Sequence, residues 1–445
     1  MGSPLLTPPR PNGFHQVEGE PGPLRRCHRV MMANTTISRR TLLTTLAGVG
    51  AATLVGCDST PAAADPLPDP LLVTLDGGLT VLRGTDRQSI GAGVATADGR
   101  LVWTAVADGA DTLLWRVDAG RGNASERVRL PGRWVPQTTS TDGTRLALTT
   151  EHLSATGDRP AGRDQTLVLI ADAAGVRQRL RLPGTVVPEA FTHDLAGLFV
   201  LEWLPPAAPD RYRVRLVDLA TGVAGPLLTR AKTAVPPGAE EEMRGDGRQA
   251  VLAPNRTVLY TLYTHQPDHQ HTRDRISGRP GRDVHAFVHT LHLEQRWAYC
   301  VDLPHPFGEG GADGHTMAIT PDGGRLYVAD VGSGAVAEIS TEELTVRRVA
   351  ALAAGGAPAY AAASTERLFL GAGTAVRTVD LTGLAVTAER ATADPVGGLV
   401  LSADGTRLYL GQRAAVCWQD PVTGGELGRA AVPGLVGLHG PARPA

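Results

Sequence analysis

Residues 320–328 read Thr-Pro-Asp-Gly-Gly-Arg-Leu-Tyr-Val, and variants of this phrase recur along the chain. Each copy has a short apolar strand, an Asp-Gly type of turn, and a second strand that begins near Arg-Leu. Glycine adopts positive φ without strain and aspartate tolerates it, so this turn is typical of a tight β-hairpin. Further copies lie at residues 96–103, 141–148, 192–200, 253–260, 364–370 and 402–410.

A third and a fourth strand follow the hairpins. Thr-Gly turns end the third strand, as at residues 218–222 and 380–383, and a more polar strand comes next, as at residues 177–182. Hairpin, strand, turn and strand make a four-stranded antiparallel unit. Successive units are about 39 to 67 residues apart, which is the spacing of propeller blades with insertions. Helical periodicity is almost absent, so the pattern excludes an α-solenoid.

The two ends of the repeat region supply one more unit. Leu71–Leu75 and Leu79–Leu82 have the pattern of second and third strands without a first, whereas Leu435–His439 has that of a first strand without successors. Joining the two ends closes a ring and covers the strand edges that an open array would expose. We therefore predict an all-β fold, a single β-propeller over residues 71–440. It has eight four-stranded blades, or seven if the terminal unit is only a clasp.

One repeat resembles a known family. Arg325-Leu-Tyr-Val-Ala-Asp330, followed from Gly332 by Gly-Ser-Gly-Ala-Val-Ala-Glu-Ile-Ser, is similar to the repeat of the YVTN bacterial propellers, which are related to WD40-like and lactonase-like propellers. The resemblance covers about residues 71–440 as a repeat pattern. It departs from the family where Ala329 and Asp330 replace Thr-Asn. It implies the fold, but it assigns no catalytic residue, because one fold serves many functions.

The N-terminal region has the pattern of an export signal. Arg39 and Arg40 form a twin-arginine motif, and the uncharged run that follows is too short to span a membrane comfortably. That run ends in Leu-Val-Gly before Cys57, which resembles the lipobox of bacterial lipoproteins, in which the cysteine thiol is alkylated by diacylglycerol. Two acyl chains suffice for stable anchoring. We expect the propeller to be extracytoplasmic and lipid-anchored at the outer face of the cytoplasmic membrane.

These motifs divide the part of the chain before the propeller. Residues 1–30 are rich in proline and glycine and precede Met31, so we interpret them as a disordered leader or as the result of a start codon placed too early. Residues 31–56 are expected to be the twin-arginine lipoprotein signal peptide, and residues 57–70 a Pro/Ala-rich tether.

Composition limits the partners. The formal net charge is −2, so the chain lacks the basic footprint of a nucleic-acid-binding protein. Besides Cys57 and Cys27, which precedes the signal, only Cys300 and Cys417 remain. Two distant cysteines form no metal-binding framework, and the sequence leaves open whether they are bridged or free.

Histidines are concentrated late in the chain, with eight of thirteen between His265 and His315. In an extended chain His265, His269 and His271 project from one face, which suits Zn²⁺, Cu²⁺ or Ni²⁺. The alternative is an inserted polar loop that stays solvated. His289 lies on an apolar strand face and is expected to be a core residue. The run at residues 240–242, Glu-Glu-Glu, is expected to be a solvated loop between blades, and the alternative is a group of carboxylates that collects Ca²⁺.

Asp313 and His315 stand at the start of an inner strand, which would line the central channel. They are therefore the candidates for a catalytic pair. No nucleophile elbow, phosphate loop, dinucleotide fingerprint or zincin motif occurs. We accordingly predict a binding module of the cell envelope, with a protein, peptide or glycan ligand at the propeller rim and no cofactor. The alternative is a lactonase-like hydrolase or an oxidoreductase with a site at the channel mouth, assisted by a metal.

Overall fold

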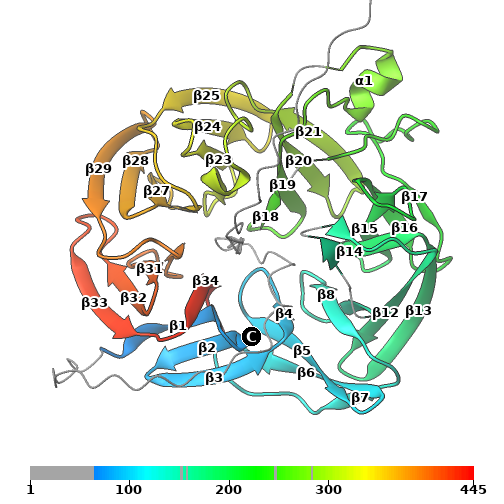
Figure 1. Ribbon diagram of the computed structural model, residues 1–445, viewed down its shortest axis with the longest axis horizontal. Coiled ribbons are helices and arrows are strands. Elements are labelled where there is room, and N and C mark those ends of the chain that lie inside the picture. Colours follow the sequence, from blue (N-terminus) through cyan, green and yellow to red (C-terminus); the bar gives the residue numbers. More distant parts are fainter. Residues whose placement is uncertain (1–64, 151–153, 157–158, 245–247, 282–283, 445) are drawn as a thin grey trace, which may run out of the picture. The chain divides into compact units, whose positions relative to one another are not determined.

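The computed structural model describes residues 65–150, 154–156, 159–244, 248–281 and 284–444. In this part of the chain, eight four-stranded antiparallel sheets follow one another around a ring (Figure 1). The first strands of neighbouring sheets contact each other, so they surround the centre, and the fourth strands lie outside. The predicted eight-bladed β-propeller is confirmed. The signal peptide, Arg39, Arg40 and Cys57 lie outside the described residues.

Blade 1 combines the two ends of the chain. Its strands, from the centre outward, are β34 (Leu435–Pro441), β1 (Leu67–Leu75), β2 (Gly78–Gly84) and β3 (Asp86–Gly91). Blade 2 contains β4 (Gly93–Ala95), β5 (Leu101–Asp108), β6 (Asp111–Asp118) and β7 (Val128–Leu130). Blade 3 contains β8 (Val135–Thr139), β9 (Leu146–Thr149), β12 (Gln165–Asp172) and β13 (Gly175–Pro183), with a small inserted hairpin of β10 (Ser154–Thr156) and β11 (Arg159–Pro160). Blade 4 contains β14 (Thr185–Phe191), β15 (Gly197–Leu204), β16 (Arg211–Asp218) and β17 (Ala224–Pro226).

The second half of the ring follows the same order. Blade 5 contains β18 (Arg248–Leu252), β19 (Val258–Thr264), β20 (Ala286–His292) and β21 (Trp297–Asp302). Blade 6 contains β22 (His315–Ile319), β23 (Arg325–Asp330), β24 (Ala335–Ser340) and β25 (Thr345–Ala351). Blade 7 contains β26 (Ala359–Ala363), β27 (Arg367–Ala372), β28 (Ala375–Asp380) and β29 (Ala385–Ala391). Blade 8 contains β30 (Gly398–Leu401), β31 (Leu408–Gln412), β32 (Ala415–Gln419) and β33 (Glu426–Ala431).

The ring closes as the sequence predicted. Strand β34 pairs antiparallel with β1, with Val73 opposite Leu438, and supplies the inner strand that blade 1 would otherwise lack. Strand β1 begins at Leu67, within the segment expected to be tether. There Asp69 accepts a hydrogen bond of 2.6 Å from the Tyr409 hydroxyl of blade 8. The closing blade is therefore tied to its neighbour by a side-chain contact as well as by its strand pairing.

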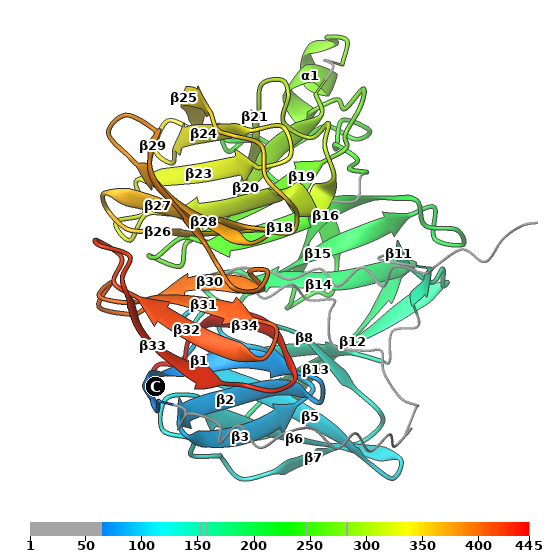
Figure 2. The same ribbon diagram turned by 60° about the vertical axis from the view of Figure 1, so that its left-hand side comes forward.

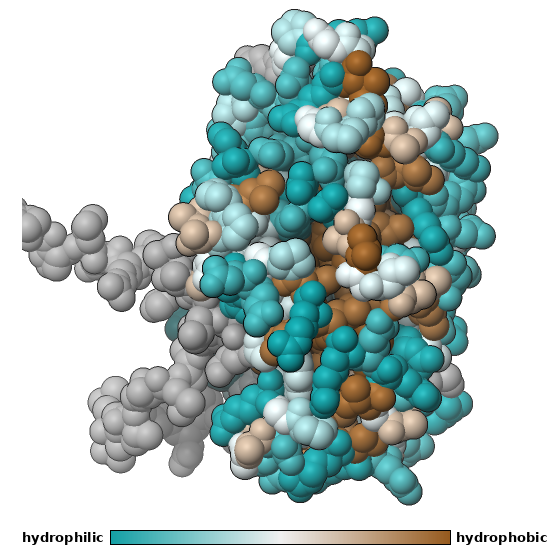
Figure 3. Space-filling view, turned by 90° about the vertical axis from the view of Figure 1, so that its right-hand side faces the viewer, coloured by the Kyte–Doolittle hydropathy of each residue, from teal (hydrophilic) through white to brown (hydrophobic). Residues whose placement is uncertain are grey.

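The core lies between the blades. Figure 2 shows the sheets side by side. Apolar side chains of neighbouring blades form buried clusters between them. Between blades 4 and 5, for example, Phe199, Leu201, Tyr263 and Phe287 belong to one buried cluster. Burial of apolar surface of this kind is the main favourable term in folding. The face seen in Figure 3 is mostly hydrophilic, with hydrophobic atoms in a broken band between polar ones.

The described residues contain a single α-helix, α1 (Thr272–Ser277), in the connection between β19 and β20. At six residues it is far shorter than a membrane span. Cys300 and Cys417 are both buried and free, so the two cysteines are not bridged.

Candidate functional site

Two long connections meet at the outer strands of blade 5. The first runs from β17 to β18 (residues 227–247), and the second runs from β19 to β20 (residues 265–285) and carries α1. In blades 1, 2, 7 and 8 the equivalent of the second connection is only a two-residue turn. In Figure 1, α1, β17 and β21 lie at the periphery of the ring. The site therefore stands apart from the centre of the ring.

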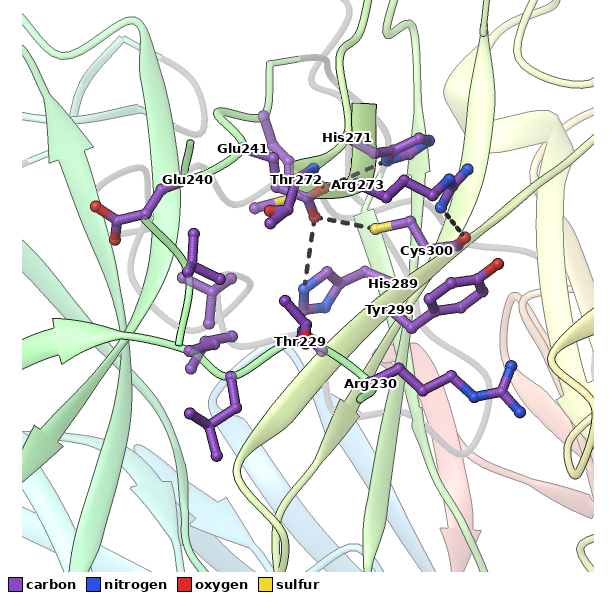
Figure 4. A pocket seen from close by; sticks show the side chains of 16 residues that line it. Thr229, Arg230, Glu240, Glu241, His271, Thr272, Arg273, His289, Tyr299 and Cys300 are labelled. Atoms are coloured by element: carbon purple, nitrogen blue, oxygen red, sulfur yellow. Dashed lines mark hydrogen bonds and ion pairs between the residues drawn. The ribbon is translucent and has the colours of Figure 1, made fainter. Parts of the chain in front are cut away.

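A cavity of about 80 Å³ lies between these two connections and β21. Its wall is partly apolar and partly ionisable (Figure 4). The lining residues are Val214, Leu227, Leu228, Thr229, Arg230, Val235, Glu240, Glu241, Met243, His271, Thr272, Arg273, His289, Ala298, Tyr299 and Cys300.

Glu241 is the centre of the polar part of the wall. Its Oε2 lies 3.3 Å from Nδ1 of His271, and its Oε1 accepts a hydrogen bond of 3.0 Å from the Cys300 thiol. The Nε2 atom of His289 is 3.9 Å from the same Oε1. In Figure 4 the carboxylate of Glu241 lies among these three side chains, whereas Glu240 points away from them. Side chains from the second connection, β20 and β21 thus converge on one carboxylate of the first connection.

The second ring nitrogen of His271 is also occupied. Its Nε2 lies 2.5 Å from Oδ1 of Asp302, at the end of β21. Arg273 donates to the other oxygen of Asp302 at 2.7 Å and to the carbonyl oxygen of Cys300 at 2.7 Å. The His271 ring is therefore fixed between two carboxylates, one of which is itself held by a cation.

These contacts set the protonation states. Burial opposes ionisation of Glu241, but hydrogen bonding and attraction to His271 outweigh it and hold the pKa of Glu241 well below its usual value. Burial likewise disfavours the His271 imidazolium, yet the hydrogen bonds to Asp302 and Glu241 raise its pKa to about 9. Burial, reinforced by the charge of Glu241, raises the pKa of the Cys300 thiol. Cys300 is thus a neutral thiol at neutral pH and not an activated nucleophile, which would need a lowered pKa.

The predicted histidine cluster is only partly assembled. His269 and His271 lie together, with ring centroids 4.6 Å apart, and His269 also stacks on Phe287 at 4.5 Å. Burial lowers the pKa of His269 to about 4, and its Nε2 has no hydrogen-bond partner among the described residues. His265 lies elsewhere, with Nε2 2.9 Å from the carbonyl oxygen of Gly310. The connection that carries these histidines is therefore partly buried and not simply a solvated loop.

The three glutamates of the acidic run, residues 240–242, also have different surroundings. Glu240 pairs with Arg213 at 2.9 Å and Glu242 with Arg211 at 2.7 Å, so both have structural partners. Only Glu241 faces the histidines and the thiol. His289, expected to be a core residue, is indeed buried in β20, but it also faces Glu241. The sequence analysis missed Cys300 as a site residue and did not single out Glu241 within the acidic run, because the nearness of these two residues depends on packing between segments far apart in the chain.

The pair proposed at the channel is arranged differently from the expectation. His315 begins β22, and the carboxylate beside it belongs to Asp330, whose Oδ2 lies 3.1 Å from Nε2 of His315. Asp313 lies in a short turn before the strand. The Gly308 N–H also donates to Nε2 of His315 at 2.9 Å. The side chains of His315 and Asp330 are 1% and 0% exposed, so they lie beneath the surface.

No protein-family model and no curated protein sequence matches the chain. Solved structures do match. Apo AztD from Citrobacter koseri is 9% identical with a TM-score of 0.50, over 82% of this chain and 95% of that one. The periplasmic gluconolactonase PpgL of Pseudomonas aeruginosa is 16% identical with a TM-score of 0.39, over 83% and 98%. BamB from Moraxella catarrhalis is 12% identical with a TM-score of 0.39, over 78% and 92%. At such identities the likeness shows the fold alone: the chain is a β-propeller similar to those of bacterial proteins.

Proposed function

We propose that this protein is a non-catalytic binding module of the bacterial cell envelope, and that its ligand occupies the cavity between blades 4 and 5. The twin-arginine motif at Arg39 and Arg40 and the lipobox at Cys57 support display at the outer face of the cytoplasmic membrane. The rigid ring supplies a scaffold on which long connections can carry a site.

The observation that carries this proposal is the cavity itself. A concave site with an apolar wall and a few convergent polar groups is the usual form of a small-ligand pocket. Here Glu241, His271 and Cys300 converge on the cavity beside Val214, Leu227 and Val235. The connection that helps to enclose it is extended in blade 5 and reduced to a two-residue turn in four other blades. Extensions of this kind, which also occur in blade 3 as the β10–β11 hairpin, are where function is expected.

The surroundings of His315, Asp330 and Cys300 favour binding over catalysis. A catalytic pair must come within hydrogen-bond reach of its substrate. His315 and Asp330 are buried and already engaged with each other, with Gly308 and with Gly332, so they hold the loop before β22 in place. The Cys300 thiol, whose pKa is raised, is not poised to attack a substrate.

The test is the mass of the protein purified from its own cells under native and under denaturing conditions. We expect the native mass to exceed the denatured mass by one discrete ligand. Ala298→Phe, which places a ring in the cavity, should abolish that difference. Ala351→Phe, on the outer strand of blade 6, is the matched control and should leave it unchanged. Equal native and denatured masses for the unmodified protein would contradict the proposal.

A further inference from the structure

We propose that Glu241, His271 and Cys300 form a site for one divalent transition-metal ion of the zinc type. The inference rests on the proposed function, since it names the class of ligand that the same cavity takes. Each of the three residues offers one ligand atom, and these atoms all lie within 4.8 Å of one another. The site brings together the β17–β18 connection, the β19–β20 connection and β21.

The spacing of the ligand atoms fits a shared ion. Ligand atoms around a tetrahedral zinc ion, at bond lengths of about 2.0 to 2.3 Å, are about 3.4 Å apart. Here Oε2 of Glu241 is 3.3 Å from Nδ1 of His271, and the other oxygen, Oε1, is 3.0 Å from Sγ of Cys300. With one ligand atom taken from each residue, all three atoms lie within 4.8 Å of one another. Small side-chain movements therefore suffice to accommodate the ion. Because all three residues line the cavity, a fourth ligand atom can come from there.

The ligand set selects the class of metal. Thiolate and imidazole favour zinc and its neighbours among the transition metals, whereas calcium and magnesium prefer oxygen ligands only. One carboxylate and one thiolate also supply two negative charges, which balance a divalent cation. The Cys300 thiol and the His271 imidazolium must each lose a proton to ligate the metal, so binding of the ion releases two protons to the solvent.

The surroundings of His271 match those of a metal-binding histidine. Such histidines commonly offer one ring nitrogen to the metal and hold the other against a carboxylate, which fixes the ring. In this protein Nδ1 lies 3.3 Å from Glu241, while Nε2 lies 2.5 Å from Asp302. Arg273 in turn holds Asp302 at 2.7 Å. Asp302 is thus a positioning residue, and the ring is oriented toward the cavity before any ion arrives.

The experiment measures zinc uptake by the purified full chain after treatment with a chelator. We expect equilibrium dialysis with elemental analysis to find one zinc ion per chain. Cys300→Ser and Glu241→Gln should each weaken zinc binding at least tenfold. Two matched controls should bind as the unmodified protein does: Cys417→Ser alters the other buried cysteine, and Glu242→Gln alters a neighbour in the same acidic run that pairs with Arg211.

A second measurement needs no variant. Cobalt(II) in place of zinc should give a near-ultraviolet charge-transfer band from a bound thiolate. The inference is overturned if the chain takes up no zinc, if all variants bind zinc equally, or if the cobalt protein lacks that band. Each of these results overturns the metal site alone. The proposed function still holds if the native mass exceeds the denatured mass by a ligand of another kind. If the native mass shows no ligand while added zinc binds with the predicted variant pattern, the metal site stands and the proposed function fails.

Discussion

The turn within the first hairpin of a blade is held by its own side chains. In blade 8, Ser402 donates to Oδ1 of Asp404 at 2.6 Å, and the backbone N–H of Thr406 donates to the same oxygen at 3.0 Å. The N–H of Arg407 donates in turn to the Ser402 hydroxyl at 2.9 Å. Equivalent Ser/Thr–Asp pairs occur at Thr96 and Asp98, Ser140 and Asp142, Thr192 and Asp194, and Thr320 and Asp322.

We predict that Asp404→Ala lowers the free energy of unfolding by about 1 to 2 kcal/mol, because the Ser402 hydroxyl and the Thr406 N–H lose their acceptor. Asp404→Asn keeps a carbonyl oxygen in the same place and should cost less. Urea denaturation of each variant measures the change. Asp86→Ala, at an exposed position in β3, is the control. Equal losses for Asp86→Ala and Asp404→Ala would show that the turn network contributes nothing.

Residue-level chemistry was predictable only where it is local. The Asp-Gly turns were expected, and Gly405 has the positive φ, 71°, that the turn requires. The hydroxyl two residues before each aspartate is also visible in the sequence. Glu241 and Cys300 could not be found in this way, because no spacing rule connects a carboxylate in one connection with a thiol on a strand of the next blade.

At the scale of elements, strand β34 contains a half-buried histidine, His439. Nε2 of His439 lies 2.6 Å from the hydroxyl of Thr74 on β1, and its Nδ1 is buried with no hydrogen-bond partner among the described residues. Burial lowers the pKa of His439 to about 4. The strand that closes the ring therefore depends on a neutral imidazole.

This histidine should make closure sensitive to acid. The unfolded chain binds a proton at His439 near pH 6.5, whereas the folded chain does so only near pH 4. The contribution of His439 to the free energy of unfolding is therefore at its maximum above about pH 6.5. It falls as the pH drops toward 4 and changes no further below that. Between pH 7 and pH 4.5, we predict that the free energy of unfolding falls by about 1 to 3 kcal/mol less in His439→Gln than in the unmodified protein. Urea midpoints at the two pH values measure it.

The control is His193→Gln, at an exposed position in the turn between β14 and β15. It should leave the pH dependence of unfolding as in the unmodified protein. If His439→Gln also leaves it unchanged, closure does not depend on the neutral imidazole.

The elements differ in how well the sequence predicts them. The terminal strands were predictable because two incomplete units complement each other, and β34 does pair with β1. The burial of the β19–β20 connection was not predictable. Its charged composition suggests solvation, whereas the structure buries His269, His271 and Asp274 there. Burial of these polar side chains costs less free energy when carboxylates and an arginine form hydrogen bonds with them. Those partners come from neighbouring segments, so the pairing depends on how the segments pack.

For the whole molecule, the repeat pattern predicted eight blades, with seven as the alternative, and the structure has eight. Seven blades each have a hairpin signal, the two ends of the repeat region form the eighth, and closure follows from the need to cover two strand edges. Function does not follow from the ring, because the same fold carries many roles. In this protein the site comes from connections that differ from the repeat.

The proposed anchor also concerns the whole molecule. We predict that Cys57→Ser moves the protein from the membrane fraction to the medium, because the diacylglycerol thioether cannot form on serine. Cell fractionation with immunodetection measures the distribution. Replacement of Arg39 and Arg40 by lysines should instead keep the protein inside the cell. Membrane retention of the Cys57→Ser variant would show that the lipid on this cysteine is not the anchor.

The central claim, a built metal site between blades 4 and 5, is tested most directly by zinc-edge X-ray absorption of the full chain loaded with one equivalent of zinc. The account predicts a four-coordinate ion with one sulfur ligand at about 2.3 Å and nitrogen or oxygen ligands near 2.0 Å. It also predicts that the sulfur contribution disappears in Cys300→Ser. A shell of oxygen and nitrogen alone in the unmodified protein would contradict it.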